Sequence, residues 1–205
     1  KSDIVHCHDV FFWYILFRFL YPHKKVFTTF HGYESFPIAK KAVMVRKISE
    51  KLSYGNICIG EFIKKWYGTT PNYISYGATK TNIIERRNNE AISINKYSAL
   101  FIGRLDEQTN ILEYAKAVKL IRKKYPKFKL TVIGDGKFRR KITETAKVLG
   151  FKNNPEKYFP KYQFAFVSRY LSILEAMAAK RLVFALYDNP IKEDYLKMSP
   201  CAKFI

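Results

Sequence analysis

The sequence predicts an α/β protein built from two Rossmann-like lobes with parallel sheets. In the first half, β-rich runs such as 3–8 and 25–30 alternate with helical stretches such as 38–52. A polar, asparagine-rich segment follows, and the alternation then restarts with the β-rich run 97–103. This rhythm is typical of βαβ units, in which helices join parallel strands. We therefore expect one lobe over residues 1–79, a linker over 80–96 and a second lobe over 97–205.

The elements of the first lobe follow from the apolar periodicity. The expected strands are 3–8, 25–30, 56–60 and 72–77, and the expected helices are 10–20, 38–52 and 61–68. The first of these helices is rich in aromatic residues on most of its surface. Burial between a sheet and neighbouring elements requires such a surface, so we interpret this helix as buried. A membrane-contacting helix is the alternative.

The second lobe repeats the pattern. The expected strands are 97–103, 128–134, 163–167 and 181–186, and the expected helices are 111–125, 138–150 and 171–180, with a turn and short helix over 188–198. The longest uncharged apolar run, 10–17, is far shorter than the ~20 residues that a membrane-spanning helix needs. The sequence therefore predicts no transmembrane helix.

Charge and cysteine content restrict the class of protein. The formal charge of +20 suits a nucleic acid, an anionic membrane surface or merely a lysine-rich composition. Basic residues form scattered pairs and short runs rather than a dense arm, which disfavours a nucleic-acid partner. Cys7, Cys58 and Cys201 are an odd number without CxxC spacing, so we expect reduced thiols in the cytoplasm.

Ligands of open parallel sheets bind at the carboxyl ends of the strands, where free backbone N–H groups gather. Gly103 ends an expected strand there and lets the chain turn, so that Arg104 presents a planar guanidinium to a diphosphate. The alternative for Arg104 is a carbonyl cap or an ion pair with Asp106.

Two further segments end strands of the second lobe. Gly134 and Gly136 let the backbone pass close to a ligand, and Asp135 between them accepts from hydroxyls or caps the next helix. A common tight turn is the alternative. Downstream, residues 168–172 precede an expected helix whose free N–H groups can hold phosphate oxygens, and Glu175 lies on the first turns of that helix. Glu175 is placed to accept two ribose hydroxyls, unless it only closes a capping box.

Histidines mark the first lobe. His31 follows a strand and precedes Gly32, so its imidazole is expected to project into the cleft between the lobes, although a structural role is the alternative. His6 and His8 flank Cys7 and precede Asp9. Strand alternation sends the two histidines to one face and the cysteine to the other, so no metal site is expected.

Together these segments resemble the retaining glycosyltransferases of family 4, also called glycosyl transferases group 1. DIVHCHD and KVFTTFHGYE resemble the family's "DvvHaHd" and "vvtTfHg" blocks. ALFIGRL, LTVIGDG and SILEAMAAKRLVFA resemble its "ilfvGRl", "l.ivGdG" and "lEAmAaGkPVva" blocks. The resemblance runs through nearly the whole sequence.

The resemblance implies a GT-B fold of two incomplete lobes, with the nucleotide-sugar in the second, no metal or other cofactor, and transfer that retains the anomeric configuration. Arg104 then contacts the diphosphate, Glu175 the ribose and the Leu171 and Ser172 backbone the phosphates, while His31 faces the reacting centre. Catalysis rests mainly on stabilising the departing nucleoside diphosphate. The family's glycine-rich first loop and last helix lie outside this sequence, so the isolated chain is expected to be inactive.

The sequence also departs from the family pattern. Thr109 and Asn110 stand where the family has a Lys-Gly pair. Val167 stands eight residues before Glu175, where the family has a first, sugar-contacting glutamate. Lys180 and Leu182 replace a family glycine and proline.

Two classes of function follow. The leading hypothesis is a cytoplasmic glycosyltransferase of surface-glycan biosynthesis with a saccharide or lipid-linked acceptor, in which the basic charge favours the anionic inner face of a membrane. The alternative is a non-catalytic GT-B-like domain that binds a nucleotide or a partner.

Overall fold

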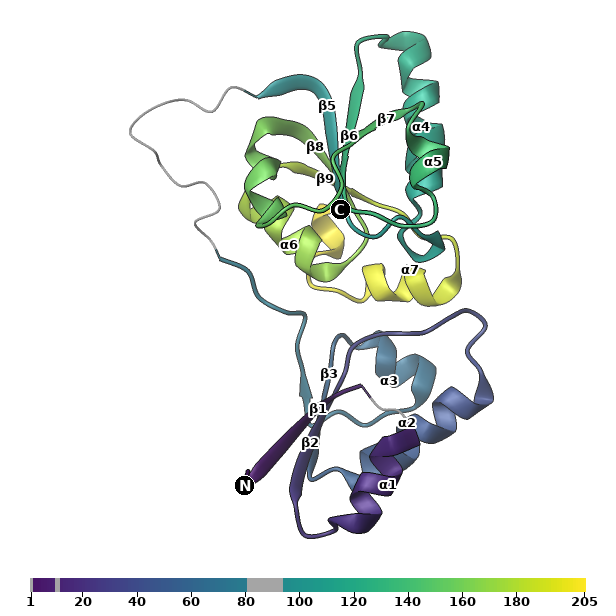
Figure 1. Ribbon diagram of the computed structural model, residues 1–205, viewed down its shortest axis with the longest axis vertical. Coiled ribbons are helices and arrows are strands. Elements are labelled where there is room, and N and C mark those ends of the chain that lie inside the picture. Colours follow the sequence, from purple (N-terminus) through teal and green to yellow (C-terminus); the bar gives the residue numbers. More distant parts are fainter. Residues whose placement is uncertain (1, 10–11, 81–93) are drawn as a thin grey trace. The chain divides into compact units, whose positions relative to one another are not determined.

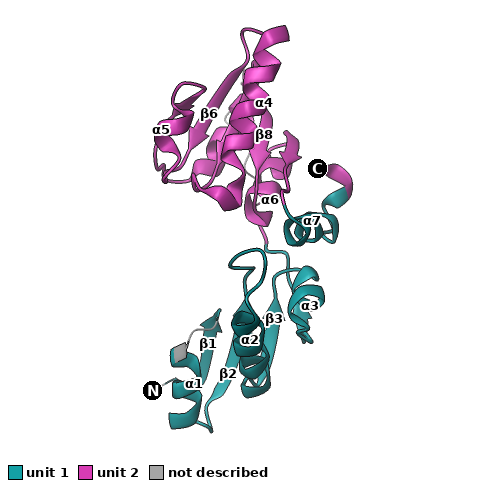
Figure 2. Ribbon diagram, turned by 90° about the vertical axis from the view of Figure 1, so that its right-hand side faces the viewer, with its two compact units in different colours: residues 1–77, 189–202 teal, residues 78–188, 203–205 magenta. Residues whose placement is uncertain are grey.

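The computed structural model describes residues 2–9, 12–80 and 94–205 (Figure 1). The chain divides into two compact units, unit 1 with residues 1–77 and 189–202 and unit 2 with residues 78–188 and 203–205 (Figure 2). Each unit has a parallel sheet, as the sequence predicted. No helix among the described residues is both long and apolar enough to cross a bilayer.

Unit 1 contains a four-stranded parallel sheet in the order β1-β2-β3-β4. Its elements are β1 (Ile4–His8), α1 (Phe12–Leu20), β2 (Lys25–Phe30), α2 (Lys40–Leu52), β3 (Gly55–Cys58), α3 (Phe62–Tyr67), β4 (Tyr73–Ile74) and α7 (Pro190–Lys197). Among the helices, α1 packs against α2, α2 against α3, and α3 against α7. The burial of β1 alternates as predicted, with Cys7 buried and His6 and His8 exposed.

The α1 helix corrects the expectation of burial. Tyr14 is fully buried and its hydroxyl bonds Oγ of Ser53 at 2.6 Å. Phe19 is nevertheless 82% exposed, Leu20 60% and Leu16 59%. A nine-residue helix beside an edge strand rests on only one side, so a helix that is apolar around most of its circumference leaves much apolar surface uncovered. The prediction that this helix is buried was therefore wrong for these side chains.

The C-terminal helix α7 belongs to unit 1, whereas the sequence-based division placed residues 97–205 in one lobe. Asp194 of α7 accepts from Nε1 of Trp66 at 2.7 Å and pairs with Nζ of Lys65 at the same distance. The rings of Phe62 and Tyr195 pack edge to face, 5.2 Å apart. These contacts depend on side chains far apart in the sequence, which local patterns do not reveal.

Unit 2 contains a five-stranded parallel sheet in the order β7-β6-β5-β8-β9. Its elements are β5 (Asn95–Ile102), η1 (Glu107–Thr109), α4 (Ile111–Lys124), β6 (Lys129–Ile133), α5 (Arg139–Ile142), β7 (Ala146–Val148), η2 (Pro155–Lys161), β8 (Tyr162–Val167), α6 (Tyr170–Ala178) and β9 (Leu182–Ala185), and the short η3 (Ala202–Phe204) follows α7. The expected linker 80–96 ends inside β5, and its residues 81–93 lie outside the described part of the chain.

The central strand β5 explains the stability of unit 2. Ala99, Leu100 and Phe101 are fully buried, as expected for a parallel strand with both faces covered. Tyr114 of α4 packs on Phe166 with ring centroids 4.8 Å apart, and its hydroxyl donates to the carbonyl of Val167 at 2.8 Å. This helix therefore holds the carboxyl end of β8 in place.

One expected helix of unit 2 is much shorter than the sequence predicted. The predicted helix 138–150 ends at Ile142, and residues 146–148 form the edge strand β7, in which Ala146 pairs with Leu130 of β6. The segment between them is rich in threonine, whose branched Cβ disfavours a helix and suits a strand. The single-helix prediction was wrong because the apolar spacing outweighed this signal.

Gly134 and Gly136 allow the loop after β6 to lie against the loop after β5. A Cβ on Gly134 would stand 1.9 Å from the carbonyl oxygen of Gly103, and a Cβ on Gly136 would stand 2.7 Å from that of Leu105. Real Cβ atoms do not approach other atoms so closely. Both glycines are therefore required by the packing of the backbone on itself.

We expect Gly134→Ala to destabilise unit 2 strongly. Overpacking costs about 1–3 kcal/mol and a left-handed non-glycine residue about 1–3 kcal/mol more, so the melting temperature in calorimetry should fall. Gly77→Ala is the control, because Gly77 shares a positive φ (86°, against 142° at Gly134) but has open space around its Cβ position. Equal losses in the two variants would contradict the close-packing argument.

Candidate functional site

The strand order of unit 2 contains a topological switch point between β5 and β8. From β5 the chain proceeds outward through β6 and β7, and then returns to place β8 on the other side of β5. Crossover helices on the two sides of such a point leave the carboxyl ends of the two strands accessible. The loops that begin at Gly103 and Ser168 emerge at this position, so they are the candidate site.

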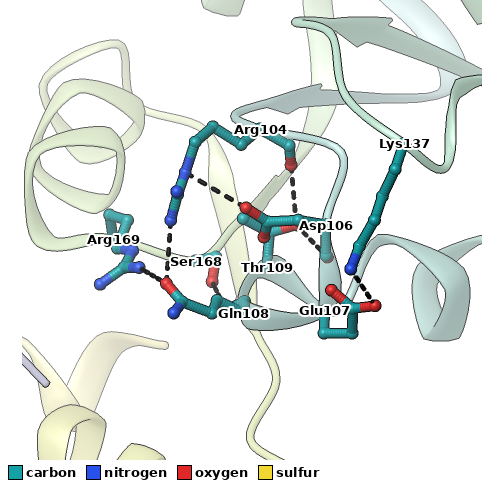
Figure 3. Close-up of polar contacts among 8 residues, drawn as sticks. All are labelled: Arg104, Asp106, Glu107, Gln108, Thr109, Lys137, Ser168 and Arg169. Atoms are coloured by element: carbon teal, nitrogen blue, oxygen red, sulfur yellow. Dashed lines mark hydrogen bonds and ion pairs between the residues drawn. The ribbon is translucent and has the colours of Figure 1, made fainter. Parts of the chain in front are cut away.

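Gln108 lies at the centre of a polar cluster at the switch point (Figure 3). Its Oε1 accepts from Nη2 of Arg104 at 2.9 Å and from Nη2 of Arg169 at 2.7 Å. Nε of Arg104 also lies 3.3 Å from Oδ2 of Asp106, so the ion pair considered as the alternative role of Arg104 is present. The Arg104 side chain is 62% exposed, and an exposed pair of this kind contributes at most about 1 kcal/mol. The guanidinium therefore remains accessible to a ligand.

Thr109 and Asn110, which stand in place of the family's Lys-Gly pair, make side-chain hydrogen bonds to backbone carbonyls. Oγ1 of Thr109 donates to the carbonyls of Arg104 and Asp106 at 2.8 and 2.9 Å. Nδ2 of Asn110 donates to the carbonyl of Leu186 at 3.3 Å, and Asn110 adopts φ 56°. Both residues are buried, so these two positions fix the loop that carries Arg104.

Asp135 is held within its own loop. Oδ1 accepts from the amide of Gly136 at 2.8 Å, and Oδ2 pairs with Nη1 of Arg139 at 2.6 Å. The Gly136 amide, and after it Arg139, lower the pKa of this carboxyl. The neighbouring glycines are explained by backbone packing alone, so ligand contacts of Gly134, Asp135 and Gly136 stay a prediction.

Helix α6 begins at Tyr170, one residue before the expected start at 171. Arg169 is its N-cap and makes no side-chain cap bond, so Leu171 and Ser172 occupy the first turn. The first-turn amides of an α-helix have no backbone acceptor within the helix and favour anions. The predicted phosphate-binding position of these two amides is therefore available, although their contact with a phosphate stays a prediction.

Glu175 is half-buried on α6, and the structure excludes the capping-box alternative because Ser172 is the third residue of the helix. Burial, and secondarily the charge of Glu156, raises the pKa of Glu175 to about 7. The described contacts place Glu175 beside η2 rather than in the Arg104 cluster. Its ribose-binding role stays a prediction.

In unit 1, His31 lies at the carboxyl edge of the sheet with two partners, the last residue of β1 and the residue that follows it. The parallel register pairs His8 with Thr29, so the ends of β1 and β2 coincide. Nε2 of His31 lies 2.7 Å from Nδ1 of His8, and the amide of His31 donates to Oδ1 of Asp9 at 2.8 Å. Arg46 holds the next residue by donating to the carbonyl of Gly32 at 2.9 Å. His31 is exposed and these contacts hold its loop, while its place at a reacting centre stays a prediction.

Among the described residues, no group of three or more His, Cys, Asp or Glu is arranged to hold a metal ion. The His6 and His8 rings do lie together, with centroids 4.5 Å apart, but Cys7 is buried on the opposite face. Strand alternation therefore separates these potential ligands, as the sequence predicted.

Sequence reasoning missed Gln108, Arg169 and His8 as parts of these clusters. Arg169 and Gln108 are 61 residues apart and meet only because β5 and β8 are adjacent. His8 and Asp9 carried a usable signal, since they end the strand that precedes the His31 strand, and consecutive parallel strands end at the same edge.

Residues 96–193 match the sequence model of the family described as Glycosyl transferases group 1. This range contains the switch point, the Gln108 cluster and α6. Over this range the chain is therefore similar to the glycosyl transferases of group 1. No curated protein sequence matches the chain.

The fold of the chain is similar to that of solved GT-B glycosyltransferases. A mutant of TarM from S. aureus, in complex with fondaparinux, α-GlcNAc-glycerol and UDP, is similar with a TM-score of 0.62 and 18% identity over 85% of this chain and 43% of that chain. The pneumococcal O-GlcNAc transferase GtfA, in complex with UDP and GlcNAc, is similar with a TM-score of 0.58 and 12% identity. The match covers 83% of this chain and 44% of that chain. An α-glucosyltransferase, in complex with UDP-glucose and DNA containing an abasic site, has a TM-score of 0.59 and 13% identity. The match covers 95% of this chain and 62% of that chain. The chain thus spans less than half of the first two structures.

The raised pKa of Glu175 makes the stability of unit 2 depend on pH. The carboxyl pKa rises from an ordinary value of 4.5 to about 7 on folding, so the folded state binds more protons between these values. The stability that this group contributes is therefore present below pH 4.5 and is lost as the pH rises to about 7. Glu175→Gln should raise the melting temperature at pH 8 and leave it nearly unchanged at pH 4.5, where the carboxyl is neutral.

Circular dichroism melts at the two pH values measure this difference. Glu144→Gln is the matched control, because Glu144 is an exposed glutamate of the same unit. A Glu175→Gln gain that is equal at both pH values would contradict the titration argument.

Proposed function

We propose that the chain is a part, with portions of both lobes, of a retaining, metal-independent glycosyltransferase, which moves a sugar from a nucleotide-sugar onto a saccharide or lipid-linked acceptor in surface-glycan biosynthesis. The observation that carries this proposal is the pair of loops at the switch point of unit 2. They place the accessible guanidinium of Arg104 beside the anion-favouring start of α6. The group 1 family match and the UDP in TarM and GtfA support a nucleotide-sugar as donor.

In this proposal the two units have different roles. Arg104 and the amides of Leu171 and Ser172 hold the donor diphosphate, and Glu175 accepts from the ribose. Positive charge and oriented amides stabilise the leaving nucleoside diphosphate, which develops negative charge as the glycosidic bond breaks. His31, ordered by His8 and Asp9, acts at the reacting centre from unit 1. None of these roles requires a metal.

We expect Arg104→Ala and Glu175→Ala each to weaken the binding of a nucleoside diphosphate by about 10- to 100-fold. A hydrogen bond to a charged group contributes about 1.5–3 kcal/mol, which corresponds to this range. Isothermal titration calorimetry with UDP, GDP and ADP measures the affinities. Arg140→Ala, which removes an exposed arginine of the same unit, is the control. If both variants retain the affinity of the unchanged chain, the proposed donor site is wrong.

The alternative is a non-catalytic GT-B-like domain that binds a nucleotide or a partner. It is favoured by Thr109 and Val167, which stand where the family has a lysine and a glutamate. An assay of donor hydrolysis and sugar transfer separates the two, because only an enzyme consumes the donor that it binds. The scattered basic residues continue to disfavour a nucleic-acid partner.

We also propose that the protein acts in the cytoplasm, at the inner face of the membrane, through α1. The exposed Leu16, Phe19 and Leu20 form an apolar surface. A hollow of about 510 Å³ at the end of α1 is lined by Leu20, Tyr21 and the basic Lys24 and Lys25, among others. Among the described residues these two lysines form no ion pair with a carboxylate. Apolar side chains next to unneutralised lysines suit the interface of an anionic bilayer.

We expect the chain to co-sediment with vesicles that contain phosphatidylglycerol, and to be released by salt. Replacing Leu16 and Phe19 by Ser together should weaken this binding at least about tenfold, since full burial of one such side chain contributes about 1.5–3 kcal/mol. Leu120→Ser is the control, because Leu120 is 63% exposed on α4 of the other unit. Equal binding to neutral vesicles, unaffected by salt, would contradict the proposal.

A further inference from the structure

The geometry of the Gln108 cluster assigns a role to Arg169. Its guanidinium and that of Arg104 come from different strands, and both donate to the same amide oxygen (Figure 3). Such an oxygen has two lone pairs, and the two arginines use both. The backbone of Gln108 is held as well, because its carbonyl accepts from Oγ of Ser168 at 3.3 Å. The two guanidinium groups are thus held side by side.

Charge in this cluster is unbalanced. Gln108 is neutral, so it orients the two cations without neutralising them. Arg104 has Asp106 within 3.3 Å, but Arg169 forms no ion pair with a carboxylate among the described residues. Arg169 is also partly buried and is the N-cap of α6, where the helix dipole adds positive potential. Positive charge that is partly removed from water and lacks an anion is unfavourable until an anionic ligand binds.

The arrangement favours one class of anion. Each guanidinium presents a planar fork of donors that matches two oxygens of one phosphate group. Two forks fixed at one amide therefore match two linked phosphate groups better than a single phosphate.

We propose that Arg169 is a binding residue for the second phosphate group of a diphosphate, and that Gln108 is the positioning residue that keeps Arg169 beside Arg104. This inference rests on the proposed function, because the diphosphate is that of the nucleotide-sugar. Thr109 and Asn110 stand where the family has a Lys-Gly pair, and their side chains bond backbone carbonyls of the chain. Arg169 would supply the second phosphate-binding cation in place of that lysine. It further predicts that selectivity for diphosphate over monophosphate depends on Arg169.

The test compares inorganic pyrophosphate with inorganic phosphate in calorimetry, since these probes do not depend on the base. UDP and UMP form a second pair. Arg169→Gln should lower the affinity for pyrophosphate and UDP by about 10- to 100-fold, the range of a charge-assisted hydrogen bond, and should change phosphate and UMP affinities by less than about threefold. Arg169→Lys keeps the charge but not the fork, so it should recover only part of the loss. Arg140→Gln removes a charge elsewhere in unit 2 and should change none of the four affinities.

The role of Gln108 has a separate readout. Gln108→Glu places a carboxylate between the two guanidinium groups, so the melting temperature should rise while pyrophosphate affinity falls, because the new carboxylate competes with the ligand. A merely structural Gln108 would not move stability and affinity in opposite directions.

The outcomes distinguish this inference from the proposed function. If Arg104→Ala loses diphosphate affinity while Arg169→Gln keeps it, the donor site stands and the role of Arg169 is overturned. Equal losses of Arg169→Gln for pyrophosphate and phosphate would overturn the assignment to the second phosphate. If the unchanged chain binds neither pyrophosphate nor any of the nucleotides, both proposals fail.

Discussion

The register between β5 and β8 is the constraint on which the candidate site depends. Leu100 pairs with Ala165 and Phe101 with Phe166, so the two strands end level with each other. Tyr114 strengthens this alignment, since its hydroxyl donates to the carbonyls of Val167 and, at 3.0 Å, of Phe184. A slip of one residue would turn the side chains of β8 to opposite faces and separate the two loops. The buried strands therefore determine where the polar groups of the loops meet.

The glycines of the loop after β6 have a structural role that the sequence did not indicate. The sequence indicated that Gly134 and Gly136 let the backbone approach a ligand. In the structure they let it approach the backbone of Gly103 and Leu105, and the amide of Leu105 donates to the carbonyl of Asp135 at 2.9 Å. The glycines thus act on the site indirectly, because they fix the loop in which Arg104 and Gln108 stand. Ligand approach and backbone packing require the same absence of a Cβ, so the sequence cannot separate them.

Local patterns predicted the parallel sheets and the motifs at their carboxyl edges, because alternation of strands and helices and strand-end glycines are local properties. They did not predict the position of α7, which depends on Trp66 and Lys65 binding Asp194. They misjudged α1, because an apolar helix surface does not reveal whether a neighbour covers it. Arg169 was missed for the same reason, since its significance arises only beside Gln108.

In both units the ends of adjacent parallel strands bring polar residues together, but the residues that meet are of different kinds. In each, polar residues just beyond the ends of two adjacent parallel strands are brought together, His8 with His31 in unit 1 and Arg104 with Arg169 in unit 2. An imidazole can both donate and accept hydrogen bonds, whereas a guanidinium only donates and carries a positive charge. The first pair is therefore suited to hydrogen bonds with groups of either kind, and the second to holding an anion. Since the parallel sheet alone creates both juxtapositions, the difference in chemistry between the units arises from the residues that follow each strand.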